Sequence, residues 1–210
     1  MAAPVAPTEI VNLALDIIKT QTIEDVEDPG GDPIAVVMNR WWDLSRRKCL
    51  EGFPWVFARK RIAIPLEASS PAFGEYSDAY KLPNDYISLN WLIDEVQPKD
   101  QFNYTIESDR LLINNSGGAS LNIGYTWDTS EVPRWSANFK LYVAHQLAAY
   151  TVFKLTGNVT ISKAVQALLQ PAMIEAKAIN GLIDPPKAYR SSKMLNARLK
   201  NSDSSAYYIK

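Results

Sequence analysis

The sequence predicts an α+β fold, a four-helix body with an antiparallel β domain inserted between helices 2 and 3, plus a flexible C-terminal tail. Apolar residues recur at three- and four-residue spacing near both ends of the body, as in amphipathic helices. Between these parts, short β-branched and aromatic runs are divided by turn residues, which is typical of antiparallel strands. After Ile183 large apolar side chains become sparse. The expected boundaries are 1–54 for helices 1 and 2, 55–128 for the β domain, 129–183 for helices 3 and 4, and 184–210 for a basic extended tail.

The first predicted helix begins after Thr8, whose hydroxyl can accept hydrogen bonds from free N–H groups of the first turn. Its apolar residues recur at helical spacing: Ile10, Leu13, Ala14, Ile17 and Ile18. The helix should end near Thr20. Residues 22–32 then combine clustered carboxylates with the helix-breaking sequence Pro29-Gly30-Gly31, so we expect an acidic loop.

The second predicted helix begins at Asp32-Pro33, because a carboxylate caps a helix N-terminus and the fixed φ of proline suits the first helical position. Six residues are expected on one stripe along it: Ile34, Val37, Met38, Trp41, Leu44 and Lys48. Arg40, Arg46 and Arg47 lie mostly off this stripe. Gly52 and Pro54 end the helix.

The β domain is predicted to contain five strands: 56–64, 86–93, 104–107, 110–113 and 120–127. Ser108-Asp109 is expected to form a hairpin turn. Residues 114–118 are expected to form a longer turn, since Asn and Gly tolerate positive φ.

Two further helices complete the predicted body. The third is expected to start at a Ser130 cap and to end at Gly157. Its stripe residues are Trp135, Phe139, Tyr142, Val143, Gln146, Tyr150 and Phe153. The fourth is expected to run from a Thr160 cap to Gly181 and to bend or break at Pro171, which cannot donate an interior hydrogen bond. Its packing face is Ile161, Val165, Leu168, Ala172, Ala176 and Ile179.

Composition narrows the functional class. Hydrophobic residues make up 47% and charged residues 21% of the chain, as in ordinary globular proteins. The start, residues 1–7, lacks the pattern of a secretory signal, and no apolar stretch is long enough for a membrane anchor. One cysteine and one histidine exclude a disulfide framework and a structural zinc site. We therefore expect synthesis in a reducing cytoplasm and no cofactor.

Charge is distributed in blocks along the chain. The sums are −6 over residues 9–32, +5 over 40–61, −7 over 62–128, +3 over 129–183 and +4 over 184–210. Two interpretations remain open: electrostatic matching between subunits, and charged faces that simply contact solvent.

No catalytic constellation is visible, so an enzyme is not expected. His145, the one histidine, falls in the middle of a predicted helix, which favours a partly buried, hydrogen-bonded structural role over that of a catalytic base. Cys49 has basic neighbours that could lower its pKa, but no general base lies nearby in sequence. Glu95, Glu107 and Asp109 are the carboxylates considered for the alternative function, a cell-wall glycan hydrolase, because such an enzyme needs only two carboxyl groups across a cleft.

Two sets of basic residues are candidate contact sites. The first, for contacts with other subunits or DNA, is Arg40, Arg46, Arg47, Arg59, Lys60 and Arg61. The acidic blocks on both sides of it argue against a large DNA footprint, so only non-specific contact is expected. The second lies in the tail, a segment expected to become ordered when it contacts a partner: Lys187, Tyr189, Arg190, Lys193, Arg198 and Lys200.

Several motifs, taken in their order, resemble a phage protein family. They are Asn12-Leu13-Ala14-Leu15, Pro54-Trp55-Val56-Phe57-Ala58 followed by Arg59-Lys60-Arg61, residues 80–86 (YKLPNDY), residues 147–150 (LAAY) and residues 155–157 (LTG). In this order they resemble the tail tubular protein A family of short-tailed phages, also called head-to-tail adaptors or connectors. The likeness extends to about residue 182.

The resemblance implies a structural virion protein located at the head–tail junction. It implies a ring of twelve copies that joins the portal protein to the tail nozzle, a protein of the tail tubular protein B type, and forms part of the channel for genome DNA. It also implies that the basic tail binds the portal. A ring would explain the charge blocks, because heterologous contacts join two different patches.

Overall fold

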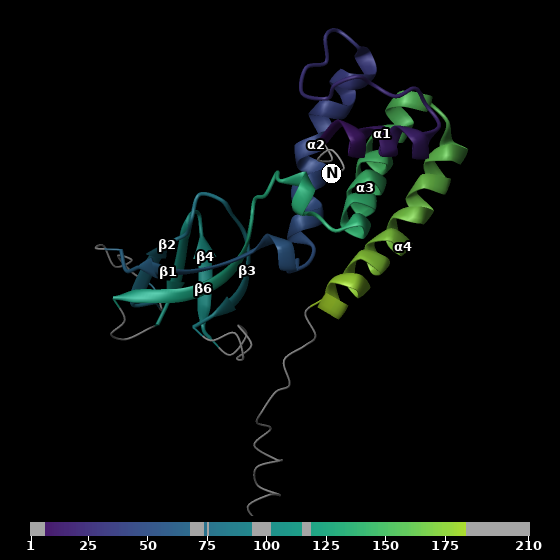
Figure 1. Ribbon diagram of the computed structural model, residues 1–210. Helices are drawn as coiled ribbons and strands as arrows, with labels where there is room; N and C mark the ends of the chain where they lie inside the picture. Colours follow the sequence, from purple (N-terminus) through teal and green to yellow (C-terminus); the bar gives the residue numbers. More distant parts are fainter. Residues whose placement is uncertain (1–6, 68–73, 75, 94–101, 115–118, 184–210) are drawn as a thin grey trace, which may run out of the picture.

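The predicted architecture is confirmed. A computed structural model describes residues 7–67, 74, 76–93, 102–114 and 119–183, and shows four helices with a β domain between the second and third (Figure 1). The elements are α1 (Pro7–Ile18), α2 (Pro33–Glu51), η1 (Val56–Ala58), β1 (Arg59–Pro65), β2 (Asp78–Lys81), β3 (Tyr86–Leu92), β4 (Tyr104–Glu107), β5 (Arg110–Ile113), β6 (Ser120–Trp127), η3 (Val132–Arg134), α3 (Ala137–Thr156) and α4 (Val159–Ile183). The tail, Glu95 and all but the first residue of the expected 114–118 turn lie outside the described residues.

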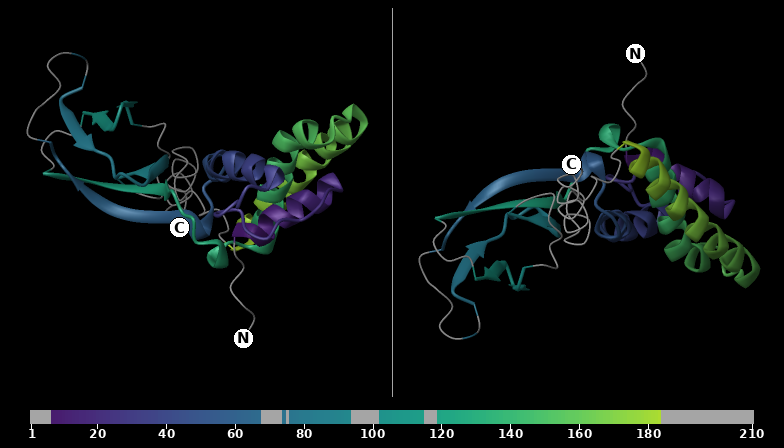
Figure 2. Two further views of the ribbon diagram at one scale, coloured as in Figure 1. Left: turned by 90° about the horizontal axis from the view of Figure 1, so that it is seen from above. Right: turned by 90° about the horizontal axis from the view of Figure 1, so that it is seen from below.

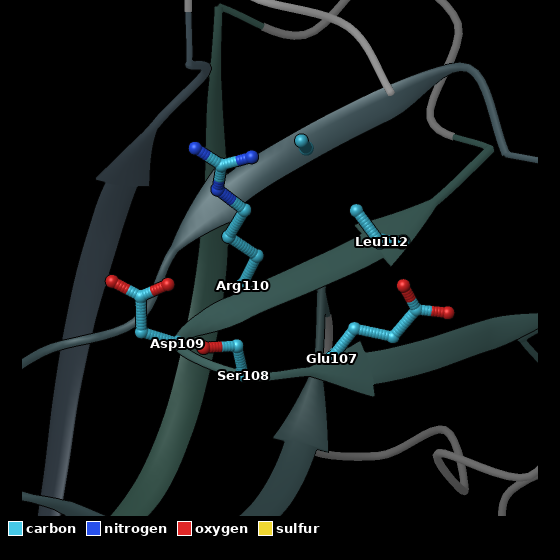
Figure 3. A pocket seen from close by; sticks show the side chains of 6 residues that line it. Glu107, Ser108, Asp109, Arg110 and Leu112 are labelled. Atoms are coloured by element: carbon cyan, nitrogen blue, oxygen red, sulfur yellow. The ribbon is translucent and has the colours of Figure 1, made fainter. Parts of the chain in front are cut away.

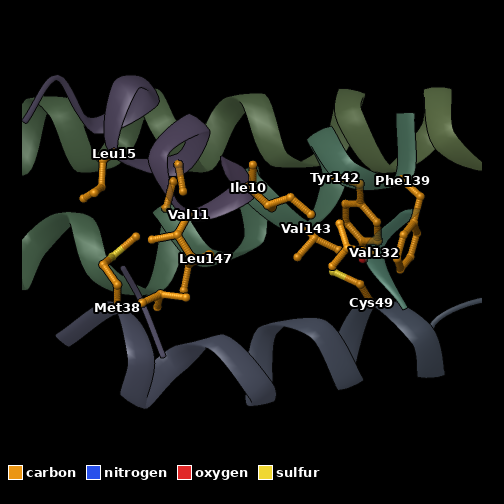
Figure 4. Close-up of a cluster of buried hydrophobic side chains, with 14 of the residues drawn as sticks. Ile10, Val11, Leu15, Met38, Cys49, Val132, Phe139, Tyr142, Val143 and Leu147 are labelled. Atoms are coloured by element: carbon orange, nitrogen blue, oxygen red, sulfur yellow. The ribbon is translucent and has the colours of Figure 1, made fainter. Parts of the chain in front are cut away.

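The helical body is built around α3, which packs against α1, α2 and α4. Figure 4 shows side chains from α1 and α2 converging on α3, with Ile10, Met38 and Leu147 among those labelled. These three side chains are fully buried. Burying apolar surface between helices is the main source of their stability, since isolated helices of this length are marginal in water.

Three helix starts differ from expectation. α1 begins at Pro7, and the Thr8 hydroxyl instead accepts a hydrogen bond from the Val26 N–H at 3.2 Å. α3 is capped by Ser136, not Ser130, because the intervening Val132–Arg134 forms a 3-10 turn. The α4 start is capped by Asn158, whose side-chain oxygen accepts from the N–H groups of residues 160 and 161. Ser136 and Asn158 thus cap the free N–H groups of α3 and α4 in place of the predicted residues. At the start of α1, Pro7 occupies the first helical position, which its fixed φ suits.

The 22–32 loop is held against the helices. Asn12 of α1 donates to the Ile23 carbonyl at 3.0 Å and accepts from the Ile23 N–H at 2.9 Å. Ile23 and Val26 are buried in the helical core. The carboxylates of the loop can therefore face outward while its apolar residues tie α1 to α2.

The β domain consists of two three-stranded antiparallel sheets, with strand orders β1-β6-β3 and β2-β5-β4. Both sheets contribute to one apolar core, which includes Ile64, Tyr80, Leu92 and Leu111. The domain lies beside the helical body in all three views (Figures 1 and 2). β2 was not predicted, and β1 starts at Arg59 instead of residue 56 because η1 precedes it.

Gly124 of β6 allows a close approach of an aromatic ring. It pairs with Arg61 of β1 on one side and with Trp91 of β3 on the other. The Arg61 guanidinium lies 5.9 Å from the centre of the Trp91 ring. A Cβ atom at position 124 would lie 2.0 Å from Trp91 Nε1, so the ring occupies the space that any other residue would need.

Gly124→Ala should therefore lower the free energy of unfolding by about 1–3 kcal/mol, because the Trp91 ring must move. Urea unfolding monitored by circular dichroism measures this effect. In a Trp91→Ala background the same glycine substitution should have almost no effect. An equal loss in both backgrounds would show that Trp91 is not the cause.

Candidate functional site

The surface of α4 that faces away from α3 is apolar. Only Val165, Ala176 and Asn180 of this 25-residue helix are buried. Seven exposed residues form what we call the outer face of α4: Ala164, Ala167, Leu168, Pro171, Ile174, Ala178 and Leu182. Leu168, Ile174 and Leu182 are exposed to 51%, 58% and 78%. A helix that is apolar on two faces usually has protein on both.

This outer face was missed by the sequence analysis. Leu168 and Ile179 were predicted to pack inward, but both are exposed. Ile161 packs inward as predicted, and the inward side is completed by half-buried Leu169 and Met173. The helix is not broken at Pro171, one of the two outcomes expected there, and it continues past Gly181 to Ile183. The signal that could have revealed the outer face is the second apolar stripe, at residues 164, 167, 168, 171, 174, 178 and 182.

The exposed face of α2, which we define by Val36, Arg40, Leu44 and Arg47, also differs from expectation. Leu44 was predicted on the packing stripe, yet it is 53% exposed, and Val36 is 42% exposed. The buried side of α2 is made by Ala35, Met38, Ser45, Arg46, Cys49 and Leu50. The helix is thus rotated relative to the predicted stripe.

Arg46, a candidate contact residue, is buried instead of exposed. Its side chain is 5% exposed and forms ion pairs with Asp43 and Asp128, and it donates to the Thr129 carbonyl at 2.8 Å. Arg47 also pairs with Asp128, at 2.6 Å. These contacts join α2 to the segment between β6 and α3. Arg46 therefore holds the helical body against the end of the β domain and does not present its charge to DNA.

The other basic candidates lie in different places. Arg59 donates to the Pro54 carbonyl at 3.1 and 3.2 Å, and Arg61 lies over Trp91. Lys60 lies 3.8 Å from the centre of the Trp127 ring and 2.5 Å from an Asp85 oxygen. Arg40 is exposed on α2 and has no ion-pair partner among the residues the structure describes. Arg59, Lys60 and Arg61 thus each contact a group of their own chain.

Asp85 connects strands of the β domain. Its carboxylate accepts hydrogen bonds from Lys60 and, at 2.9 Å, from the Tyr125 hydroxyl. Burial opposes ionisation of Asp85, but these hydrogen bonds and the Lys60 charge outweigh it, so the Asp85 pKa is lowered. Burial, reinforced by Asp85, raises the pKa of Tyr125. This arrangement is a structural ion pair with a cation–π contact.

Two of the three carboxylates considered for glycan hydrolysis line one pocket. Glu107 and Asp109 line a pocket of about 430 Å³ on the β4–β5 hairpin, with Arg110 between them in the view of Figure 3. Arg110 pairs with Glu67 at 2.9 Å, and Asp109 lies 3.9 Å from Lys81. Both Glu107 and Asp109 are exposed. The structure thus brings them together at an open hairpin and does not enclose them.

Cys49 and His145 lie in the helical body. Burial raises the pKa of the Cys49 thiol, outweighing the lowering influence of Tyr142 and Lys48, so its basic neighbours do not activate it. Burial lowers the pKa of His145, which keeps the ring neutral at physiological pH. Its Nδ1 has no hydrogen-bond partner among the described residues. His145 is partly buried, as predicted, but within the described part of the chain its Nδ1 is not hydrogen-bonded as expected.

A search of the described ranges finds no group of three or more His, Cys, Asp or Glu side chains that could hold a metal ion. Among the helices that the structure describes, none has the length and apolar character to cross a membrane. No model of a known protein family matches the sequence, and no curated protein matches it.

Proposed function

We propose that this protein is a structural virion protein, a subunit of a head-to-tail adaptor ring that joins a portal to a tail nozzle and lines part of the DNA channel. The outer face of α4 carries the proposal. Contiguous exposed apolar surface on a folded domain marks a contact with another protein. Leu168, Ile174 and Leu182 are each more than half exposed along one face of one helix. A subunit that functions by contacting its neighbours requires such a face.

The architecture supports the same proposal. The motif resemblance implies a helical body with a β domain between helices 2 and 3, and the chain has this architecture. A shared fold alone does not define a function, so the exposed face of α4 is stronger support for the proposed function than the architecture is. The basic tail, residues 184–210, follows α4 in the sequence, and we propose that it binds the portal. The number of twelve copies comes from the resemblance.

Assembly with the portal tests this function. The portal protein of the same phage would be mixed with the full chain or with a version that ends at Ile183, and the products examined by native mass spectrometry and electron microscopy. We expect a ring of the full chain on the portal and loss of attachment on truncation, because the tail would supply the portal contacts. Failure of the full chain to form any multimer on the portal would refute the proposal.

The rival function, a virion-associated glycan hydrolase, has weaker support. Glu107 and Asp109 share a pocket, but neither is buried, and a general acid usually needs an apolar enclosure to keep its proton at neutral pH. A peptidoglycan turnover assay separates the two functions. We expect no turnover by the wild-type chain and no difference from a Glu107→Gln variant.

A further inference from the structure

We propose that the outer face of α4 of one copy docks on the exposed face of α2 of a second copy, with Glu175 and Arg40 forming an ion pair between the two chains. This inference rests on the proposed ring function and names the partner of the α4 surface. The partner is an identical chain, contacted through a different surface.

The two faces lie on opposite sides of the helical body. α3 packs against both α2 and α4, and Figures 1 and 4 both place α3 between them. A contact between two different patches is heterologous, so each copy can bind one neighbour through α4 and another through α2. Such contacts build a closed ring when the rotation between copies permits it. A contact of α4 with α4 would instead stop at a dimer.

The apolar residues of the two faces have matching spacing. Val36 and Leu44 of α2 are eight residues apart, as are Ile174 and Leu182 of α4. At 1.5 Å per residue each pair spans about 12 Å along its helix. Ala178 lies midway along the α4 pair, where its small side chain leaves room for the stem of Arg40, which lies midway along the α2 pair. The two apolar pairs can therefore pack against each other across the interface.

The charges on the two faces are complementary. Glu175 is the only carboxylate between residues 159 and 183, and it lies one turn from Ala178 beside the outer face. Neither Glu175 nor Arg40 has an ion-pair partner among the described residues. Arg47, the other cation on the α2 face, is already paired with Asp128. The exposed carboxylate beside this face, Asp43, is likewise already paired, with Arg46. Burying Arg40 or Glu175 alone would be unfavourable, whereas docking α4 on α2 gives each an opposite charge.

Cross-linking between single-cysteine variants tests which faces meet. Leu44→Cys and Ala178→Cys would be made as separate full-length chains, mixed in the presence of portal, and treated with a short bismaleimide. The native Cys49 is fully buried and should not react. We expect a heterodimer that contains one chain of each variant, and a ladder of products from a chain that carries both substitutions. Glu107→Cys mixed with Ala178→Cys is the matched control and should give no such product.

Charge reversal provides a second measurement. Arg40→Glu and Glu175→Arg should each weaken assembly by about tenfold or more, and the chain carrying both should recover most of it, because the pair is restored in reverse. Equal assembly by all four chains would overturn the ion pair. Efficient homodimers of Ala178→Cys, or rings that form without the expected cross-link, would overturn the α2–α4 contact while leaving the adaptor function intact.

The tail is the other candidate occupant of the α4 face. If Ala178→Cys reacted with maleimide only after truncation at Ile183, the tail of the same chain would cover the face and the inference would be wrong. Absence of any multimer on the portal would instead refute the adaptor function itself.

Discussion

Asp128→Asn should lower the free energy of unfolding by about 3 kcal/mol. Asp128 accepts from both Arg46 and Arg47, and the Arg46 side chain is 5% exposed. Removing one partner of a buried ion pair typically destabilises a protein by about 3–5 kcal/mol, because the remaining charge is left in a poorly hydrated place. Arg46 retains Asp43 and the Thr129 carbonyl, so the lower end of that range applies.

Urea unfolding at neutral pH, monitored by circular dichroism, measures the loss, and Asp43→Asn is the matched control. Asp43 contacts the same guanidinium at 3.1 Å, but its side chain is 74% exposed. Removing an exposed partner typically changes stability by less than about 1 kcal/mol, because water already screens that charge. Similar losses for the two variants would show that burial of the Arg46–Asp128 pair is not what stabilises the junction.

This ion pair also shows why the sequence analysis misplaced Arg46. Helical periodicity assigns a basic residue to the solvent side unless its counter-charge is known. The counter-charge here is Asp128, which lies 82 residues further along the chain. Nothing local in α2 indicates it. The helix orientation that buries Arg46 also exposes Leu44.

The elements themselves were largely predictable, because their signals are local. The Asp32-Pro33 start of α2 is confirmed, with the Asp32 carboxylate accepting from the Ile34 N–H at 2.8 Å. Gly157 ends α3 with φ of 63°, a conformation that glycine adopts without strain. β2 has four residues, as do β4 and β5, but β4 and β5 flank the predicted Ser108-Asp109 turn, whereas β2 pairs with β5 from far along the chain and has no local turn signal.

The candidate site was harder to predict than the fold. Both stripes of α4 are apolar, so periodicity alone could not decide which one packs on α3. The choice depends on the surface that α3 presents and on Asn180, whose side-chain oxygen accepts from the Val56 N–H at 2.9 Å. This bond ties the C-terminal end of α4 to the chain entering the β domain. The remaining stripe is left exposed as the outer face.

Trp55→Ala should have the largest effect on the stability of the helical body, a loss of about 3–5 kcal/mol. Trp55 is fully buried, and its Nε1 donates to the Cys49 carbonyl at 2.8 Å. Its ring lies 4.8 Å from that of Phe139 and 5.2 Å from that of Phe53. Truncation would remove these contacts and leave a cavity. It would also leave the Cys49 carbonyl without its hydrogen-bond donor.

Two variants separate these contributions. Trp55→Phe keeps an aromatic ring but loses the indole N–H and some volume, so we expect a loss of about 1–2 kcal/mol. Trp42→Ala removes the same type of side chain from a half-buried site stacked on Trp135 at 6.2 Å, and should also cost less than Trp55→Ala. Because removing a tryptophan changes fluorescence, unfolding would be monitored by helix circular dichroism. If Trp42→Ala were the more destabilising substitution, the core of the body would centre on the α2–η3 contact and not on the aromatic cluster around Trp55.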